Sequence, residues 1–133
     1  MVVSSKQDLG ITPQGRVQVG KTQIQVEIAK TGSQIEKGLS DRAHLDPQAG
    51  MLFELGQPRL ATFWMKDMKI PLDIIWINQG KIVGIEKNAP VPTTDNIPTF
   101  RSPQVVNEVL EVNAGFSDQN KLQAGDKVEL MNP

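Results

Sequence analysis

The alternation of apolar and polar residues predicts short β-strands along most of this chain. Apolar residues occupy every second position of 17–19 and again of 24–28, with a Gly-Lys turn between them. A two-residue period places one face of a strand against the core and the other face in solvent. Residues 16–28 are therefore predicted to form a hairpin of two half-buried strands.

Further apolar segments of strand length follow at close spacing. They cover Met51 to Leu55, Leu60 to Met65, Leu72 to Asn78, Lys81 to Lys87, Glu108 to Asn113 and Lys127 to Met131. Residues 74–77 are apolar on both faces, which predicts a central strand. Residues 88–104 contain four prolines and are predicted to be irregular, either as a lid over a groove or as an exposed connection.

Two short helices are predicted to interrupt the strands. Ser33 and Glu36 have the spacing of a capping box, and they precede a predicted helix over about residues 34–42. Ser117 can cap a single helical turn over residues 117–122.

One domain accounts for the whole pattern. Residues 15–133 are predicted to form a mostly-β fold, a single small antiparallel β-barrel or sandwich with two short helices. A chain of 133 residues buries roughly two-thirds of its unfolded surface, which is enough for one core. Residues 1–14 are polar without a period, so we expect a flexible N-terminal arm there.

Composition narrows the chemistry. The absence of cysteine excludes thiol catalysis, disulfides and zinc–thiolate sites. A net charge of −1 gives no attraction to nucleic acid, and no apolar run approaches the ~20 residues of a membrane helix. The first residues are compatible with a start placed after a removed signal peptide. In that case the protein would be extracytoplasmic, in the periplasm or its equivalent, and otherwise cytoplasmic.

Residues 62–77 combine both tryptophans with a dense set of charges. An unpaired buried charge is costly, so this segment is expected to supply both core and site. Trp76 lies between apolar neighbours in the predicted central strand and is expected in the core. Trp64 shares pleat parity with Lys66 and is expected to border a polar cleft.

Four charged residues complete the candidate site. Lys66 and Asp73 flank the turn at Pro71, and they would lie close together if the strands on either side paired. Such a pair would either bind a ligand or fix the hairpin as a structural ion pair. Arg42 and Glu111 would join it across an open face, or would remain separate surface charges.

Several short motifs occur in a specific order. They are Gly38-Leu39-Ser40-Asp41-Arg42, Gly50-Met51-Leu52-Phe53, Phe63-Trp64-Met65-Lys66, Ile70-Pro71-Leu72-Asp73, Val109-Leu110-Glu111 and Gly125-Asp126-Lys127-Val128. Across residues 16–131 the chain resembles the domain-of-unknown-function family 192. The resemblance implies a small, mostly antiparallel β-domain, common on exported bacterial proteins, and no established activity. It also favours a shared site, because the four charged candidates fall inside these motifs.

Two functions remain open at this point. The first is a non-enzymatic binding or accessory domain with a shallow polar cleft for an anionic or hydroxylated ligand or a peptide segment. Its predicted ligand-binding residues are Arg42, Trp64, Lys66, Asp73 and Glu111. The alternative is a hydrolase acting on an envelope polymer, with Asp73 and Glu111 as its catalytic acid–base pair.

Metal binding has a weaker basis. Met51, Met65, Met68 and His44 offer soft ligands of the kind that suit copper(I), but methionine more often fills core gaps. We therefore expect no metal and no cofactor. The expected partner is an unknown small molecule, glycan or peptide rather than nucleic acid, and the expected oligomeric state is a monomer.

Overall fold

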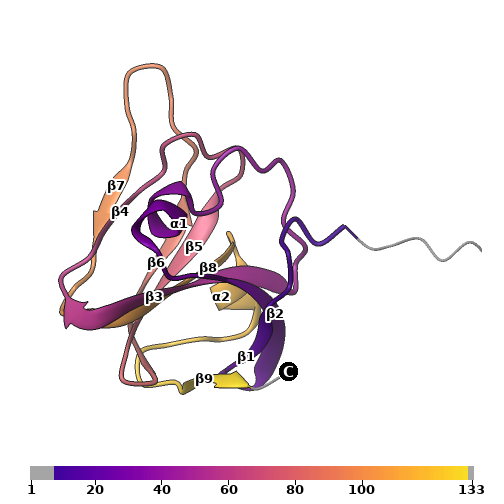
Figure 1. The fold of residues 1–133 in the computed structure, drawn as a ribbon, viewed down its shortest axis with the longest axis vertical. Coiled ribbons are helices and arrows are strands. Elements are labelled where there is room, and N and C mark those ends of the chain that lie inside the picture. The colour runs from indigo at the N-terminus through magenta and orange to yellow at the C-terminus, as the bar shows by residue number, and fades with distance from the viewer. Residues whose placement is uncertain (1–7, 132–133) are drawn as a thin grey trace, which may run out of the picture.

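A curled sheet of seven strands dominates the computed structural model, which describes residues 8–131 (Figure 1). In spatial order the strands are β6 (Lys81–Ala89), β5 (Leu72–Asn78), β8 (Val106–Asn113), β3 (Ala49–Arg59), β2 (Thr22–Ala29), β1 (Gly15–Val19) and β9 (Val128–Met131). A bridge between Lys81 and Lys127 brings the two ends of this order together, so the sheet curls into a half-barrel. The predicted mostly-β fold is confirmed, and β5 is the expected internal strand.

The sheet is mixed, whereas the sequence pattern predicted an antiparallel one. β2 and β3 run parallel, because the connection between them crosses over and includes the helix α1 (Gly32–Lys37). A parallel pair needs such a crossover, since a tight hairpin can only reverse the chain.

A second sheet contains β4 (Thr62–Trp64) and β7 (Thr99–Arg101), which pair antiparallel. β7 falls within the proline-rich segment that was predicted to be irregular, so that prediction was wrong for three residues. The predicted pairing of the strands around Pro71 was also wrong, because β4 pairs with β7 and β5 belongs to the large sheet.

The first helix begins earlier than predicted. Its capping box is formed by Thr31 and Gln34, which have the same spacing as the predicted pair Ser33 and Glu36. The helix ends at Gly38, whose φ of 50° favours glycine and whose Cα lies against the Phe53 ring.

The second helix, α2 (Phe116–Gln119), is also shorter than the predicted 117–122. The residue before it is Gly115, which has no side chain to cap the helix. The N–H groups of Gly115 and Ser117 at its N-terminus donate instead to the side chain of Asp73 on β5.

Two apolar clusters cover opposite faces of the large sheet. One face contains Phe53, Trp76 and Val109; it is called the pocket-side face, because it borders the pocket described below. The other face contains Ile75 and Leu110 and is called the α2-side face, because Phe116 of α2 packs there. Trp76 is 2% exposed, which confirms its place in the core. The predicted core methionines lie in the pocket-side cluster; they are Met51, Met65 and Met68.

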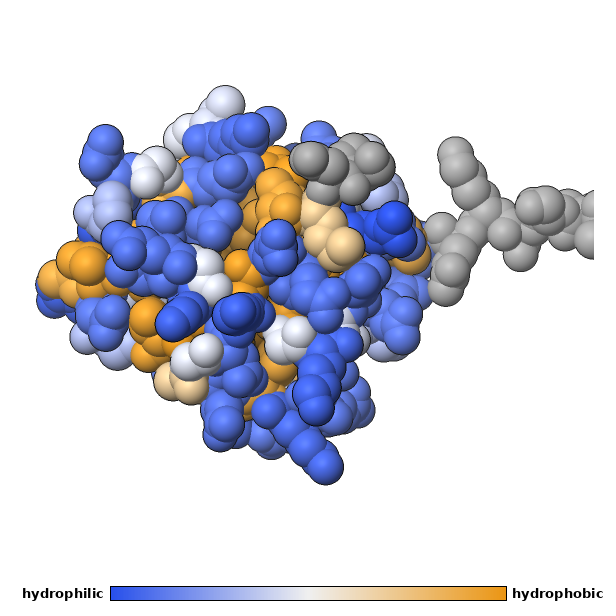
Figure 2. Space-filling view, turned by 90° about the horizontal axis from the view of Figure 1, so that it is seen from below, coloured by the Kyte–Doolittle hydropathy of each residue, from blue (hydrophilic) through white to orange (hydrophobic). Residues whose placement is uncertain are grey.

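The predicted N-terminal arm lies partly outside the described residues. Its described part, residues 8–14, contacts the domain: Asp46 N–H donates to Leu9 O at 3.0 Å, and Gln14 N–H donates to Val26 O at 2.8 Å. One view of the surface is mostly hydrophilic, with apolar residues in separate groups (Figure 2). No helix among the described residues is long and apolar enough to cross a membrane.

Candidate functional site

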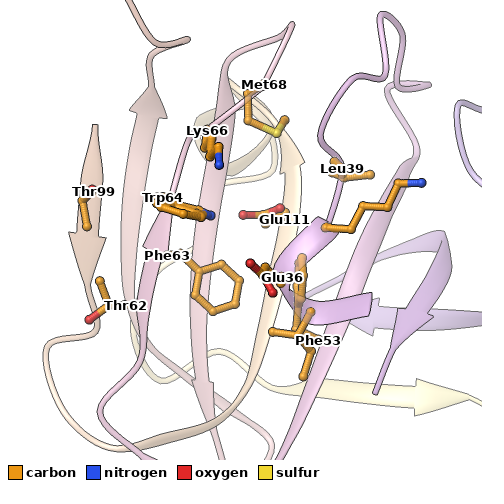
Figure 3. Close-up of a pocket in the computed structure, with 13 residues that line it drawn as sticks. Glu36, Leu39, Phe53, Thr62, Phe63, Trp64, Lys66, Met68, Thr99 and Glu111 are labelled. Atoms are coloured by element: carbon orange, nitrogen blue, oxygen red, sulfur yellow. The ribbon is translucent and has the colours of Figure 1, made fainter. Parts of the chain in front are cut away.

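A pocket of about 300 Å³ separates α1 from β4 on the pocket-side face (Figure 3). Its size is at the lower end of the range for ligand pockets. Its lining combines aromatic and aliphatic side chains with a few charged ones; the residues are Ile35, Glu36, Lys37, Gly38, Leu39, Phe53, Thr62, Phe63, Trp64, Lys66, Met68, Thr99 and Glu111.

Two local structures hold the walls apart. The capped helix α1 and the turn after it supply residues 35–39 on one side. On the other side, Asp67 adopts a positive φ of 60° and turns the chain after β4. Asp41 N–H donates to Asp67 O at 2.8 Å, so the two walls are joined at one end.

Glu111 lies deep in this pocket. It comes from β8, where it is the register partner of Met51 on one side and Ile74 on the other. Figure 3 shows its carboxyl group between Trp64 and Leu39. The residue is 4% exposed, and its carboxyl group forms no hydrogen bond or ion pair with any residue of 8–131. Burial raises the pKa of Glu111 to about 8, so the carboxyl group is mostly neutral at pH 7.

The aromatic wall is built from packed rings. Phe63 contacts Phe53 and Trp76 edge-to-face, with ring centroids 4.9 Å and 5.7 Å apart. Trp64 remains 45% exposed at the rim, and Lys66 Nζ lies 5.1 Å from the centre of its ring. The predicted proximity of Trp64 and Lys66 is therefore confirmed, as a cation–π contact.

Asp73 lies on the other face of the sheet. It is the register partner of Val112, whereas Glu111 pairs with Ile74, so the two carboxyl groups project from opposite faces. Asp73 Oδ1 accepts from the N–H of Asn88 at 2.9 Å and of Gly115 at 3.3 Å, and Oδ2 accepts from Ser117 N–H at 2.9 Å. Asp73 thereby caps α2 from β5.

The predicted contacts of Asp73 were therefore wrong. Asp73 forms no ion pair with Lys66, because the strands around Pro71 diverge into different sheets. It forms no acid–base pair with Glu111, because the two side chains project from opposite faces of one sheet. Its burial reflects a structural role in joining β5 to α2.

Arg42 also lies apart from the pocket. It forms a bidentate ion pair with Glu27, at 2.8 Å and 3.0 Å, and donates to Gly10 O at 3.1 Å. The hydrogen bond from Arg42 lowers the pKa of Glu27. The predicted four-residue constellation is thus divided among three places, and only Lys66 and Glu111 share one.

Sequence reasoning missed the residues of α1 and two of the aromatic ones. The sequence pattern predicts strands for Phe53 and Phe63 and a helix cap for Glu36, and it marks none of the three as a site residue. Phe53 has the pleat parity of Met51, but only the pairing of β3 with β8 places it beside Glu111. Of the predicted segment 88–104, Thr99 lines the pocket, whereas residues 90–98, which include the predicted tip, do not.

The pocket combines apolar walls with one deep carboxyl group. A neutral carboxyl group can donate one hydrogen bond and accept others, whereas an ionised one can only accept and attracts cations. Within residues 8–131, no three histidine, aspartate or glutamate side chains are grouped closely enough to hold a metal ion.

Comparison with known proteins places this architecture among uncharacterized relatives. Residues 15–130 match the model of the family DUF192, described as "Uncharacterized ACR". A solved protein of Sinorhizobium meliloti 1021, whose description suggests a transcription regulator, is similar with 34% identity and a TM-score of 0.82, covering 87% of this chain and 92% of its own.

A protein of unknown function from Novosphingobium aromaticivorans DSM 12444 is similar with 28% identity and a TM-score of 0.80. That match covers 95% of this chain and 99% of the other. No curated protein matches the sequence.

Proposed function

The chain belongs to the family DUF192, and we propose that it is a non-enzymatic binding domain whose ligand enters the pocket between α1 and β4. The observation that carries this proposal is Glu111, a carboxyl group that is buried, faces the pocket and has no polar partner there. A buried polar group without a partner costs about 1–3 kcal/mol, which a ligand that hydrogen-bonds to it would offset.

The lining narrows the kind of ligand. Aromatic and aliphatic walls suit an apolar stem, and Glu111 suits a group that donates or accepts a hydrogen bond at its end. An anion is disfavoured beside Glu111 itself, because this carboxyl group is buried and Arg42 is paired elsewhere; at the rim, Lys37 and Lys66 lie with Glu36. The sequence suggested anionic ligands, hydroxylated ligands or peptide segments. The pocket favours the last two of these classes.

Hydrolysis has less support. The second carboxylate that an acid–base mechanism needs was expected to be Asp73, which lies on the opposite face of the sheet. A role in transcription, suggested by the description of the Sinorhizobium protein, is not favoured by the net charge of −1. We therefore propose neither.

A thermal-shift screen over glycans, peptides and small molecules tests the binding function. A compound that stabilises the protein is expected to raise its Tm by several degrees. The shift should disappear in Trp64→Ala, which removes an exposed rim residue, and persist in Arg42→Gln, which alters a charge outside the pocket. A shift of equal size in both variants would place the ligand elsewhere and overturn this site.

We also propose that the protein works outside the cytoplasm, as a monomer. The proposed location comes from the family's expected setting rather than from the site. Fractionation of cells that carry the native gene tests the location, and light scattering on the purified protein tests the oligomeric state.

A further inference from the structure

One backbone edge of β4 is paired with no strand of residues 8–131, and it is called the free edge below. Its register with β7, together with bonds from Ser102 N–H to Ala61 O and from Met65 N–H to Pro98 O, shows which residues bond across this pair. Antiparallel strands alternate bonded and non-bonded residue pairs. Thr62 and Trp64 are therefore non-bonded toward β7, and their N–H and C=O groups point to the opposite edge, where no described strand pairs with β4.

This free edge borders the pocket. Thr62 and Trp64 project from one face of β4 and Phe63 from the other, yet all three line the same pocket. Residues of both faces of β4 therefore border the pocket, together with Thr99 of β7, which shares the face of Trp64. The pocket thus offers main-chain donors and acceptors beside its aromatic wall and the Glu111 carboxyl group.

We propose that the ligand is an extended peptide segment that adds to the free edge of β4 as a strand and places a lysine or arginine side chain against Glu111. The inference rests on the proposed binding function and specifies its partner. Strand addition is a common form of peptide recognition, in which main-chain bonds give affinity and alternate side chains enter pockets.

A basic side chain fits both parts of the lining. Its aliphatic stem packs on Phe53, Phe63 and Leu39, while its charged end reaches a carboxylate and the faces of aromatic rings. A pairing between that cation and Glu111 would satisfy a deep carboxyl group of the pocket lining that has no partner among residues 8–131.

The charges around Glu111 are nearly balanced. α1 contributes Glu36 and Lys37, and the chain after β4 contributes Lys66. The register neighbours of Glu111 on β3 and β5 are the apolar Met51 and Ile74. None of these residues forms an ion pair with Glu111. Lys37 and Lys66 at the rim are exposed, so solvent screens their repulsion of an incoming cation.

Binding of a cation should release a proton. The pKa of Glu111 is raised to about 8 by burial, so at pH 7 only about a tenth of the molecules carry the ionised form. Since the cation binds that form, affinity is expected to rise about tenfold between pH 7 and pH 9, with nearly one proton released per peptide at pH 7.

Selection from a display library of random nine-residue peptides tests the proposal. The full chain serves as bait, and Glu111→Gln serves as the counter-selection. Enriched peptides are expected to carry lysine or arginine at one fixed position, flanked by strand-forming residues. Failure to enrich any peptide, or enrichment without a basic residue, would overturn the proposal.

Calorimetry on one enriched, synthesised peptide then tests the binding mode. Replacement of its basic residue by norleucine is expected to weaken binding at least tenfold and to abolish the rise between pH 7 and pH 9. Methylation of alternate peptide amides should weaken binding at one parity and not at the other. Equal effects at both parities would exclude strand addition.

Two matched variants locate the edge. Thr62 and Arg101 are register partners, and their N–H groups point to opposite free edges of the β4–β7 pair. Proline is tolerated at such positions. Thr62→Pro is expected to weaken binding at least tenfold and Arg101→Pro less than twofold, with Tm measured to confirm folding. An equal loss in both would contradict docking on β4.

The result also separates the two proposals. If no peptide binds but a glycan or small molecule raises Tm in wild type and not in Trp64→Ala, the binding function stands and strand addition fails. If peptides bind equally to wild type, Trp64→Ala and Glu111→Gln, the pocket is not the site and both proposals fail.

Discussion

Two buried carboxyl groups lie one register position apart on the same sheet, and they have opposite surroundings. Asp73 is 1% exposed and accepts three backbone hydrogen bonds on the α2-side face. Glu111 is 4% exposed and has no polar partner within residues 8–131 on the pocket-side face. Burial alone therefore does not separate a structural acid from a binding one; the hydrogen bonds around it do.

The difference has an energetic meaning. A carboxylate that accepts several backbone bonds stabilises the fold, and its removal leaves buried N–H groups without acceptors. A carboxyl group that has lost its hydration and gained no partner destabilises the fold, a cost tolerated at sites where a ligand supplies the missing bonds. The two residues should thus respond to substitution with opposite signs.

The largest expected effect is that of Asp73→Ala. It leaves the N–H groups of Asn88, Gly115 and Ser117 without their acceptor, and we expect the free energy of unfolding to fall by about 4 kcal/mol. Urea denaturation measures this. A loss below about 1 kcal/mol would show that solvent replaces these bonds and that the contrast with Glu111 is false.

Glu111→Gln should act in the opposite direction. Glutamine fills the same space without the cost of keeping a buried acid neutral, so the free energy of unfolding at pH 7 should rise by about 2 kcal/mol. The same denaturation experiment checks it. Destabilisation of the size expected for Asp73→Ala would mean that Glu111 has a structural partner, and would remove the basis of the proposed site.

The pH dependence of stability sharpens the comparison. The folded pKa of Glu111, about 8, lies above its ordinary value of 4.5, so between these values the folded state binds more protons than the unfolded state. Stability contributed at low pH is therefore lost as pH rises, by up to about 1.4 kcal/mol per pH unit. Denaturation from pH 5 to pH 8 should show this slope in wild type and a smaller one in Glu111→Gln. Identical slopes would contradict the raised pKa.

The smallest expected effect concerns Arg42, which was predicted in the site and lies outside it. Arg42→Gln should lower the free energy of unfolding by about 1 kcal/mol, because the ion pair with Glu27 is partly exposed. Since the pKa of Glu27 is lowered, this contribution is present above pH 4.5 and is lost as pH falls through the folded pKa. The ligand affinity of Arg42→Gln should equal that of the wild type. A tenfold loss of affinity would show that Arg42 contributes to the binding site.

Local patterns were enough for much of the fold. Strict alternation placed β1 and β2, and the apolar run of residues 74–77 identified β5 as an internal strand, since both are properties of neighbouring residues. Cap positions were less certain, because Thr31–Gln34 and Ser33–Glu36 offer the same side-chain spacing and the choice depends on where the chain leaves β2.

The site was predicted only in part. Trp64 and Lys66 are two residues apart, so their proximity follows from local chain geometry, although β4 ends at Trp64 and Lys66 lies in the turn after it. Asp73 and Arg42 were assigned to the wrong surroundings, because their contacts depend on which distant strands pair, and separation along the chain does not encode this.

By itself, the sequence determined the mostly-β class, the core position of Trp76 and the family, since these follow from local period and motif order. Only the tertiary structure decided that Glu111 and Asp73 face opposite sides, that α1 forms one wall of the pocket and that β4 has a free edge. The physical reason is that a carboxyl group acquires its pKa and its partners from residues that strand pairing brings near, and that pairing is a property of the whole sheet.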